Sequence, residues 1–254
     1  MDEQKNTYRE YEPSLNLKPF LHCYWAYDTP DSDRGHTGSN PIIPDGCVDI
    51  IFNLNLPTQS ECFVVGPMTQ PIFNTKNNLF GIRFKPGMAA SFFQSPIREM
   101  TDQILTLNHI DRFKTQNIAD HLANSTSPGS KTALVESIFE QMLSGKPGLE
   151  RRVQFAINAI ESSNGNINVQ ELTHQIGWSR QHFTRQFLNI TGLSPKFFSQ
   201  VIKVNRVINI HKDQKCGCSL GDLAQIGGYY DQAHMTNAFK KITGLTPQLF
   251  FKNI

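Results

Sequence analysis

The sequence predicts an α+β protein, in which a small β-rich domain with a few helices precedes an all-helical domain. Two observations predict this order. Short runs of β-branched and aromatic residues, bounded by Pro, Gly and Asn, recur in the first half and are typical of strands. The last hundred residues have helical periodicity and carry one pattern twice, 52 residues apart. The length of 254 residues also fits two domains better than one.

The strand-forming runs of the first domain predict a small sheet or a partial barrel. We expect strands at Pro19–Asp28, Cys47–Leu54, Glu61–Val65 and Asn78–Phe84. Their aromatic residues supply enough apolar surface to line a ligand pocket, and they serve equally well as a packed core. These residues are Phe20, Tyr24, Trp25, Phe52 and Phe84.

Three helices are expected after the strands, at Met88–Phe93, Thr115–Ala123 and Lys131–Leu143. The last of them places Leu134, Ile138 and Met142 on one face, at steps of four residues. That stripe either packs within the domain or forms the contact of a homodimer. The segment Ser144–Gly148 contains Gly and Pro and is the predicted linker, so the domains are expected at 1–146 and 149–254.

Two polar motifs of the first domain allow either a structural or a ligand-binding interpretation. The Asp45-Gly46 pair is typical of a hairpin turn, and Asp49 with Arg83 is typical of a structural pair across strands. The alternative is a small-molecule site, for which the candidate residues are Tyr24, Asp45, Asp49 and Arg83.

The repeated pattern of the second half contains the signals that begin and end helices. Ser179 and Asp231 are N-cap residues, whose side-chain oxygens accept from free backbone N–H groups. Gly192 and Gly244 follow each helix at the position where only glycine adopts the left-handed conformation without strain. A capping-box-like start opens a shorter helix upstream in each copy. Two short helices around a Gly-containing turn form a helix-turn-helix, so the chain is predicted to carry two such units.

The second helix of each unit has an apolar face and a polar face. Phe183 with Phe187, and Met235 with Phe239, stand four residues apart and are expected to face the core. The opposite face carries Arg, Gln, Asn and Thr, which are side chains that read base edges in the major groove. The candidate DNA-binding residues are Ser179, Arg180, Gln181, Thr184 and Arg185 in the first unit, and Gln232, His234, Thr236, Asn237 and Lys240 in the second.

A long helix is expected to join the two units. Between Pro195 and His211, the residues Phe197, Val201, Val204 and Ile208 form an apolar stripe. At ~1.5 Å per residue this helix spans about 25 Å. Recognition helices on one face of a duplex stand about 34 Å apart, so the helix and its two units have a suitable length.

Charge is divided unevenly between the two halves. Residues 1–149 have 12 Lys and Arg against 16 Asp and Glu, a net charge of −4, whereas residues 150–254 have 12 against 6, a net charge of +6. An asymmetry of this kind marks the second half as the part that binds a polyanion. No apolar run reaches the ~20 residues of a membrane span, and the polar start lacks a signal peptide, so we expect a cytoplasmic protein without membrane contact.

Neither a metal site nor a catalytic motif is predicted. The five cysteines should be reduced thiols, and Cys216-Gly-Cys218 lacks the further ligands that a closed zinc site requires. No His-x-x-x-His, Gly-x-Ser-x-Gly, phosphate-binding or dinucleotide-binding pattern occurs. We therefore expect no cofactor, no metal and no enzymatic activity.

The second half resembles the C-terminal DNA-binding domain of the AraC/XylS family of bacterial transcription regulators. The matching residues are the turns at Ile176–Ser179 and Gly228–His234, together with the two Thr-Gly-Leu-Ser/Thr-Pro endings. The resemblance covers about residues 150–254 and implies two recognition helices in successive major-groove segments. It also implies that Gln181, Thr184 and Arg185 face the groove. The first half resembles an N-terminal domain that a subset of the family carries, without an assigned role.

These observations predict a sequence-specific DNA-binding transcription regulator. The resemblance favours an activator, for which RNA polymerase is a partner, and the first domain is expected to bind a small-molecule effector or to form a homodimer. The alternative is a ligand-binding module or enzyme formed by the β-rich domain, with an accessory DNA-binding tail. It would require an acid–base pair or a metal cluster that the sequence does not display.

Overall fold

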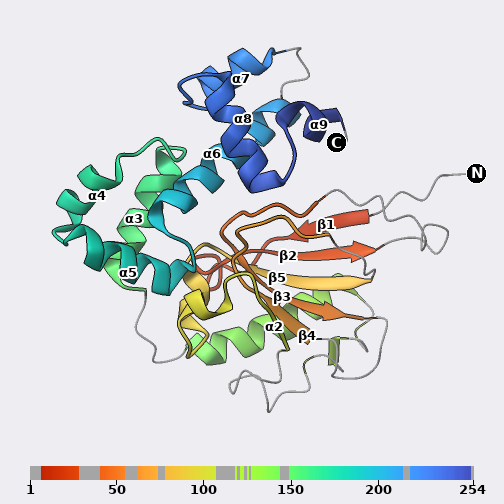
Figure 1. Ribbon diagram of the computed structural model, residues 1–254. Coiled ribbons are helices and arrows are strands. Elements are labelled where there is room, and N and C mark those ends of the chain that lie inside the picture. Colours follow the sequence, from red (N-terminus) through yellow and green to blue (C-terminus); the bar gives the residue numbers. More distant parts are fainter. Residues whose placement is uncertain are drawn as a thin grey trace, which may run out of the picture.

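The computed structural model contains the predicted β-rich part followed by the predicted helical part (Figure 1). It describes residues 7–28, 41–54, 62–73, 78–106, 118, 121–122, 125, 127–143, 149–213 and 218–252. The predicted linker at 144–148 and most of the predicted helix at 115–123 lie outside these residues, although Ile118, His121 and Leu122 are helical.

The described residues of the first part form a six-stranded antiparallel sheet in the order β1-β2-β5-β3-β4-β6. All four predicted strands are confirmed, with bounds that differ from those expected by at most two residues. The edge strands β1 and β6 were not predicted, because the first is polar and the second has only three residues. The strands are β1 Thr7–Tyr11, β2 Leu21–Asp28, β3 Val48–Asn53, β4 Cys62–Val65, β5 Leu79–Phe84 and β6 Ile104–Thr106.

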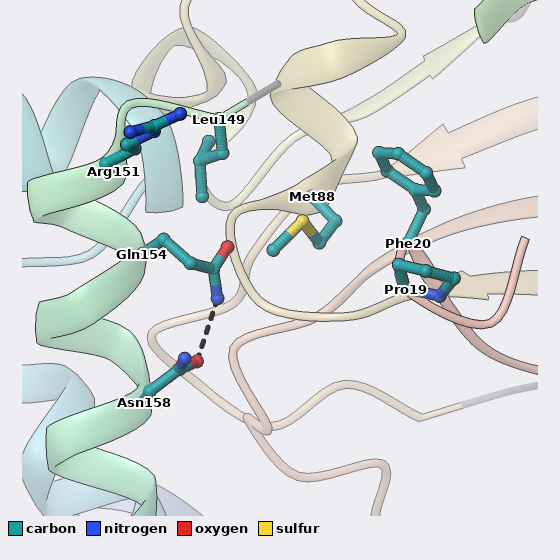
Figure 2. Close-up of a pocket in the computed structure, with 7 residues that line it drawn as sticks. All are labelled: Pro19, Phe20, Met88, Leu149, Arg151, Gln154 and Asn158. Carbon is teal, nitrogen blue, oxygen red and sulfur yellow. Dashed lines mark hydrogen bonds between the residues drawn. The ribbon is translucent and has the colours of Figure 1, made fainter.

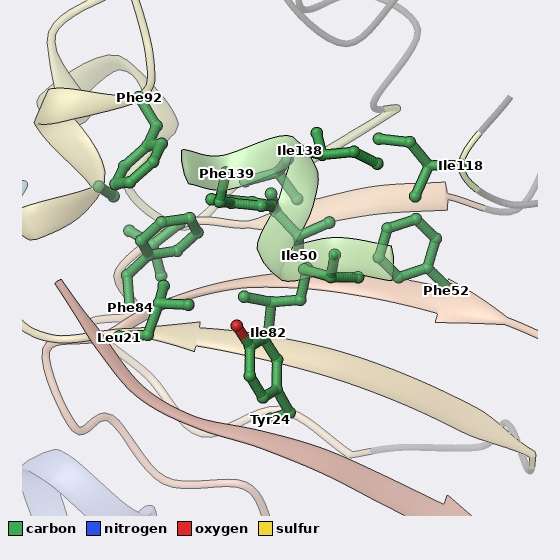
Figure 3. Packing of buried hydrophobic residues seen from close by; sticks show 14 of the residues in the cluster. Leu21, Tyr24, Ile50, Phe52, Ile82, Phe84, Phe92, Ile118, Ile138 and Phe139 are labelled. Atoms are coloured by element: carbon green, nitrogen blue, oxygen red, sulfur yellow. The ribbon is translucent and has the colours of Figure 1, made fainter. Parts of the chain in front are cut away.

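One face of the sheet packs against helix α2 (Pro128–Leu143) and two 3-10 turns, η3 (Met88–Ser91) and η4 (Ile97–Met100). Because side chains alternate along a strand, Tyr24, Phe52 and Phe84 all point to this face, where they are fully buried (Figure 3). The aromatic rings of Phe84 and Phe139 stand 5.7 Å apart across the layer. Tyr24, Phe52 and Phe84 are therefore core residues rather than the lining of a pocket.

The predicted stripe on the last helix of the first domain packs within the domain. Ile138 is buried against the sheet, and Leu134 and Met142 pack around the same core. The stripe is thus not available as a dimer contact. The other expected helix, Met88–Phe93, is a 3-10 turn of four residues that begins after a left-handed Gly87.

The opposite face of the sheet carries a second, smaller apolar cluster around Trp25, Ile51 and Met68. Gly81 lies directly across from Trp25 in the ladder. A Cβ atom at Gly81 would lie 2.0 Å from the indole ring, so only glycine leaves room for this tryptophan.

The described residues of the second part form seven helices, arranged as two lobes. Each lobe has its own apolar core, and the long helix α6 contributes to both (Figure 1). Phe197 of α6 packs against both cores. The helices are α3 Arg151–Ser162, α4 Val169–Ile176, α5 Arg180–Thr191, α6 Pro195–Asp213, α7 Leu220–Ile226, α8 Gln232–Thr243 and α9 Pro247–Lys252.

Candidate nucleic-acid interface

The first helix-turn-helix consists of α4 and α5. The Asn168 side chain accepts from the backbone N–H of Gln170, and the Ser179 hydroxyl accepts from that of His182, so both helices are capped. Gly177 ends α4 in the left-handed conformation, with φ of 71°. These local signals were read correctly from the sequence.

The second helix-turn-helix repeats this construction with α7 and α8. Ser219 and Asp222 form a complete capping box, and the Asp231 carboxylate accepts from the backbone N–H of His234 at 2.7 Å. Both recognition helices, α5 and α8, end in a left-handed glycine, Gly192 and Gly244. The recognition helices of the two units therefore share the same N-cap hydrogen bond, from the third residue after the cap, and the same left-handed glycine at their C-terminal end.

The predicted inner and outer faces of the recognition helices are present. Phe183, Phe187, Met235 and Phe239 are fully buried. Among the ten candidate DNA-binding residues, Thr184 and Thr236 are half-buried. The other eight are exposed: Ser179, Arg180, Gln181, Arg185, Gln232, His234, Asn237 and Lys240.

Arg185, in the middle of α5, is held by its neighbours. One guanidinium nitrogen stands 3.2 Å from Nδ1 of His182, and the His182 ring packs edge-on against Trp178 with centroids 4.6 Å apart. The guanidinium of Arg152 lies over the same tryptophan ring at 5.3 Å. The exposed arginine is therefore partly oriented before any ligand arrives.

Two differences distinguish the second recognition helix. Asn237 stands where the first unit has Arg185, six residues after the N-cap, so a neutral amide replaces a guanidinium. Tyr230, just before the N-cap, is 93% exposed and corresponds to Trp178. Sequence reasoning did not select Tyr230, although aligning the two copies places an aromatic residue at this position in both.

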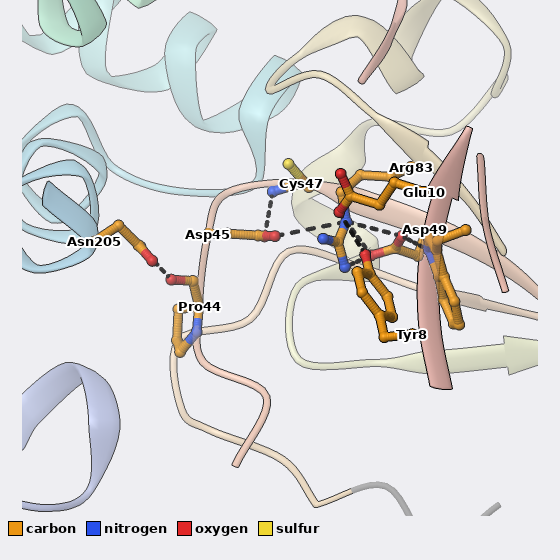
Figure 4. Close-up of polar contacts among 9 residues, drawn as sticks. Tyr8, Glu10, Pro44, Asp45, Cys47, Asp49, Arg83 and Asn205 are labelled. Atoms are coloured by element: carbon orange, nitrogen blue, oxygen red, sulfur yellow. Dashed lines mark hydrogen bonds and ion pairs between the residues drawn. The ribbon is translucent and has the colours of Figure 1, made fainter. Parts of the chain in front are cut away.

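The four candidate ligand-binding residues do not form one site. Tyr24 is fully buried on the α2 side of the sheet, whereas Asp45, Asp49 and Arg83 gather on the other side (Figure 4). The Arg83 Nε donates to Asp49 Oδ1 at 3.1 Å and stands 3.7 Å from Asp45 Oδ2. Tyr24 must therefore be removed from the proposed set, because alternation along β2 directs it to the opposite face.

The Asp49–Arg83 pair joins directly opposed residues of β3 and β5, as the structural interpretation predicted. Burial raises the pKa of Asp49, and the Arg83 guanidinium opposes this rise. The indole N–H of Trp25 also donates to Asp49 Oδ1, at 2.9 Å. The Asp45 carboxylate accepts from the backbone N–H of Cys47 and so forms a turn. This turn is not the predicted hairpin turn, because β2 and β3, the strands on either side of it in the sequence, are separated by β5 in the sheet.

A cavity of about 420 Å³ lies between the β-rich part and α3. Its lining combines apolar side chains from both parts with Arg151 and two amide side chains (Figure 2). The Gln154 amide donates to the Asn158 side chain at 2.8 Å on this wall. The lining residues are Pro19, Phe20, Met88, Leu149, Arg151, Gln154 and Asn158.

Two of the thiols, Cys23 and Cys47, are less nucleophilic than a free thiol. Burial raises the pKa of Cys23 to about 12 and that of Cys47 well above its usual range. Cys216 lies outside the described residues. Within those residues, no group of three or more His, Cys, Asp or Glu side chains is placed to hold a metal ion. None of the helices described is both long and apolar enough to cross a membrane.

Comparison with known families confirms the helix-turn-helix prediction. Residues 172–253 match a family model described as a helix-turn-helix domain. Residues 9–106 match a domain of unknown function. No match was found among curated proteins.

Three of the solved structures that resemble this chain are AraT and two forms of ToxT. The C-terminal domain of AraT, a response regulator from Geobacillus stearothermophilus, is 18% identical over 41% of this chain and 87% of its own, with a TM-score of 0.38. ToxT from Vibrio cholerae is 9% identical over 98% of both chains, with a TM-score of 0.47. A ToxT structure bound to an unsaturated fatty acid is 10% identical over 99% of this chain and 96% of its own, with a TM-score of 0.41. Because these TM-scores are below 0.5, the identification of the helix-turn-helix units rests on the family match and on the geometry of the two units.

Proposed function

We propose that this chain is a DNA-binding transcription regulator and that it reads a specific DNA sequence with α5 and α8. The proposal starts from the two helix-turn-helix units and from the helix-turn-helix family model that residues 172–253 match. The observation that carries the proposal is the polar face that both recognition helices present, with eight of its ten candidate residues exposed to solvent. The apolar residues on the opposite face of each helix are fully buried. Helix faces of this composition bind base edges and phosphates in the major groove.

The charge of the second half supports this proposal. A net charge of +6 over residues 150–254 supplies the phosphate contacts that most of the affinity for DNA requires. If the chain neutralises about six phosphates, log K should fall with log salt concentration at a slope near −5. Titrating labelled duplex DNA with the full chain at several salt concentrations measures this slope. A slope near zero would mean that binding does not depend on phosphate contacts.

The finer regulatory properties are part of the same proposal. We expect the chain to activate transcription through RNA polymerase, to work in the cytoplasm, to act as a homodimer and to have no catalytic activity. Because the α2 stripe packs within the domain, a dimer contact would have to lie elsewhere. Strands β1 and β6 are the edges of the described sheet, and free strand edges pair readily with a second chain. Sedimentation of the full chain measures whether a dimer forms.

Control by a small molecule is a second proposed property, favoured by the cavity between the β-rich part and α3. A ligand there would contact Phe20 and Met88 of one part and Arg151 of the other, so it could change how the parts pack. The lining favours an apolar anion, because Arg151 is the charged residue of an otherwise apolar and amide wall.

The fluorescent apolar anion 1-anilinonaphthalene-8-sulfonate tests this site. We expect Arg151→Gln to weaken its binding by about tenfold, since a hydrogen bond to a charged group contributes roughly 1.5–3 kcal/mol. Arg98→Gln, at an exposed arginine outside the cavity lining, is the matched control. Equal binding by both variants would remove the cavity as the effector site.

A further inference from the structure

Three segments of the β-rich part form one platform beneath the helical lobes. We define the platform as residues 41–47, 66–73 and 97–103. Ile42 and Ile72 form a two-bond bridge between the first two segments, at 2.8 and 3.0 Å. The Asp102 carboxylate accepts from the backbone N–H and the hydroxyl of Thr69, both at 2.6 Å, and so connects the second segment to the third.

The platform contacts the first helix-turn-helix where α5 ends. The Thr101 hydroxyl donates to the carbonyl of Gly192 at 2.7 Å. A Cβ atom at Gly192 would lie 2.7 Å from Pro67 Cγ and 3.3 Å from Ile97 Cγ2. The turn after the recognition helix therefore lies directly on the platform, and only glycine permits this close approach.

The platform also contacts the long helix that joins the two units. The Asn205 side-chain amide donates to the carbonyl of Pro44 at 2.9 Å (Figure 4). Gly46 packs against the ring of Phe198, and a Cβ atom at this glycine would lie 2.6 Å from the ring. The position of α6 is thus fixed at two points that lie seven residues apart along the helix.

The second helix-turn-helix contacts the same platform at the equivalent turn. A Cβ atom at Gly244 would lie 3.3 Å from Pro71 Cγ. Ile43, from the first segment, packs against the apolar core of the second lobe. The two glycines that end the recognition helices, Gly192 and Gly244, therefore adjoin prolines four residues apart in one segment of the β-rich part.

We propose that the platform fixes the separation and orientation of α5 and α8, and thereby determines which spacing between two DNA half-sites the chain accepts. This inference rests on the proposed DNA-binding function. None of the contacts described uses a residue from the exposed faces of α5 and α8, so the platform holds the recognition helices in place without covering their base-reading side chains. Residues Pro67, Pro71, Thr101 and Asn205 are accordingly positioning residues rather than DNA contacts.

A fixed geometry has a measurable consequence for affinity. Two linked modules bind a matching pair of sites 10²–10⁴-fold more tightly than one, and this gain is lost when the geometry forbids simultaneous contact. Inserting 5 base pairs rotates one half-site by about half a turn, because a turn of DNA contains about 10–10.5 base pairs. We therefore expect the wild-type chain to bind the natural spacing about 100-fold more tightly than the 5-base-pair insertion.

The test compares the full chain with the double variant Thr101→Val/Asn205→Ala. This variant removes the two hydrogen bonds described above between the platform and the helical part, Thr101 to Gly192 and Asn205 to Pro44. Thr132→Val is the matched control, because the Thr132 hydroxyl also donates to a backbone carbonyl, but within α2. The probes are a selected bipartite duplex, the same duplex with 1–6 inserted base pairs, and a single half-site. We expect the double variant to bind the single half-site like wild type, while its spacing preference falls from about 100-fold to about 10-fold.

Each outcome distinguishes this inference from the proposed function. A double variant with the spacing profile of wild type would overturn the role of the platform while leaving DNA binding intact. Equal loss of affinity for all probes would also overturn it, because the platform would then act on the stability of the units rather than on their spacing. Failure of the wild-type chain to bind any probe would contradict the proposed function instead.

A second measurement needs no DNA and uses a different pair of substitutions. Spin labels at Glu171→Cys on α4 and Gln225→Cys on α7, both exposed, report the distance between the lobes in a background with Cys216 and Cys218 replaced by serine. We expect one narrow distance distribution in the wild-type background. The variant Pro67→Ala/Pro71→Ala should broaden it, and an unchanged distribution would overturn the inference.

Discussion

Replacing Arg83 with methionine is expected to lower the free energy of unfolding by about 3–5 kcal/mol at pH 7, because it leaves the buried carboxylate of Asp49 without its counter-charge. The Arg83 side chain is only 21% exposed and makes three hydrogen bonds to Asp49, so water replaces these bonds poorly when the guanidinium is removed. Urea unfolding of the wild-type chain and of Arg83→Met, followed by circular dichroism, measures the difference.

The pH dependence of this loss identifies its cause. Burial raises the pKa of Asp49 in the folded chain, and removing Arg83 removes the interaction that opposes this rise. A carboxyl whose pKa is higher in the folded state is destabilising once it ionises, so the penalty is absent below its unfolded pKa and grows as the pH rises through the folded value. We expect the difference between the two proteins to be smaller at pH 5 than at pH 7. The variant Asp49→Asn/Arg83→Met, which leaves no charge at either position, should recover much of the loss. A difference that does not change with pH would show that lost packing is the cause instead.

Much of the helical part could be predicted because its signals are local. Ser179, Asp231 and the two C-terminal glycines act through hydrogen bonds and dihedral angles within a few residues, so each works wherever the sequence places it. The burial of Phe187 and Phe239 follows from a spacing of four residues on one helix. The exposed face of each recognition helix is the complement of that spacing.

The contacts between the parts could not be predicted from the sequence. Thr101 and Gly192 stand 91 residues apart in the chain, and Pro44 and Asn205 stand 161 apart. No local pattern marks either pair, because both depend on how the sheet and the lobes pack. The same reason explains why Tyr24 was grouped with Asp49, since only the register of β2 shows that they lie on opposite faces.

Replacing Arg185 with alanine is expected to weaken sequence-specific DNA binding by about 1–3 kcal/mol and to relax the preference at one base position. Arg185 is exposed in the middle of α5 and oriented by His182, and a guanidinium there can donate two hydrogen bonds to one guanine. Asn237, at the equivalent position of α8, is suited to adenine instead. Arg9→Ala is the matched control, because it removes an exposed arginine of strand β1, outside the platform. Unchanged sequence specificity in Arg185→Ala would show that other residues contact the bases.

The most direct test of sequence-specific binding through two helices is selection of duplexes from random DNA by the full chain and, in parallel, by Arg185→Ala. We expect the wild-type chain to enrich two half-sites whose centres stand about one helical turn apart. The variant should enrich the same pair with one position relaxed, in one half-site only. No enrichment by the wild-type chain at low salt, or enrichment of a single half-site, would contradict recognition through both α5 and α8.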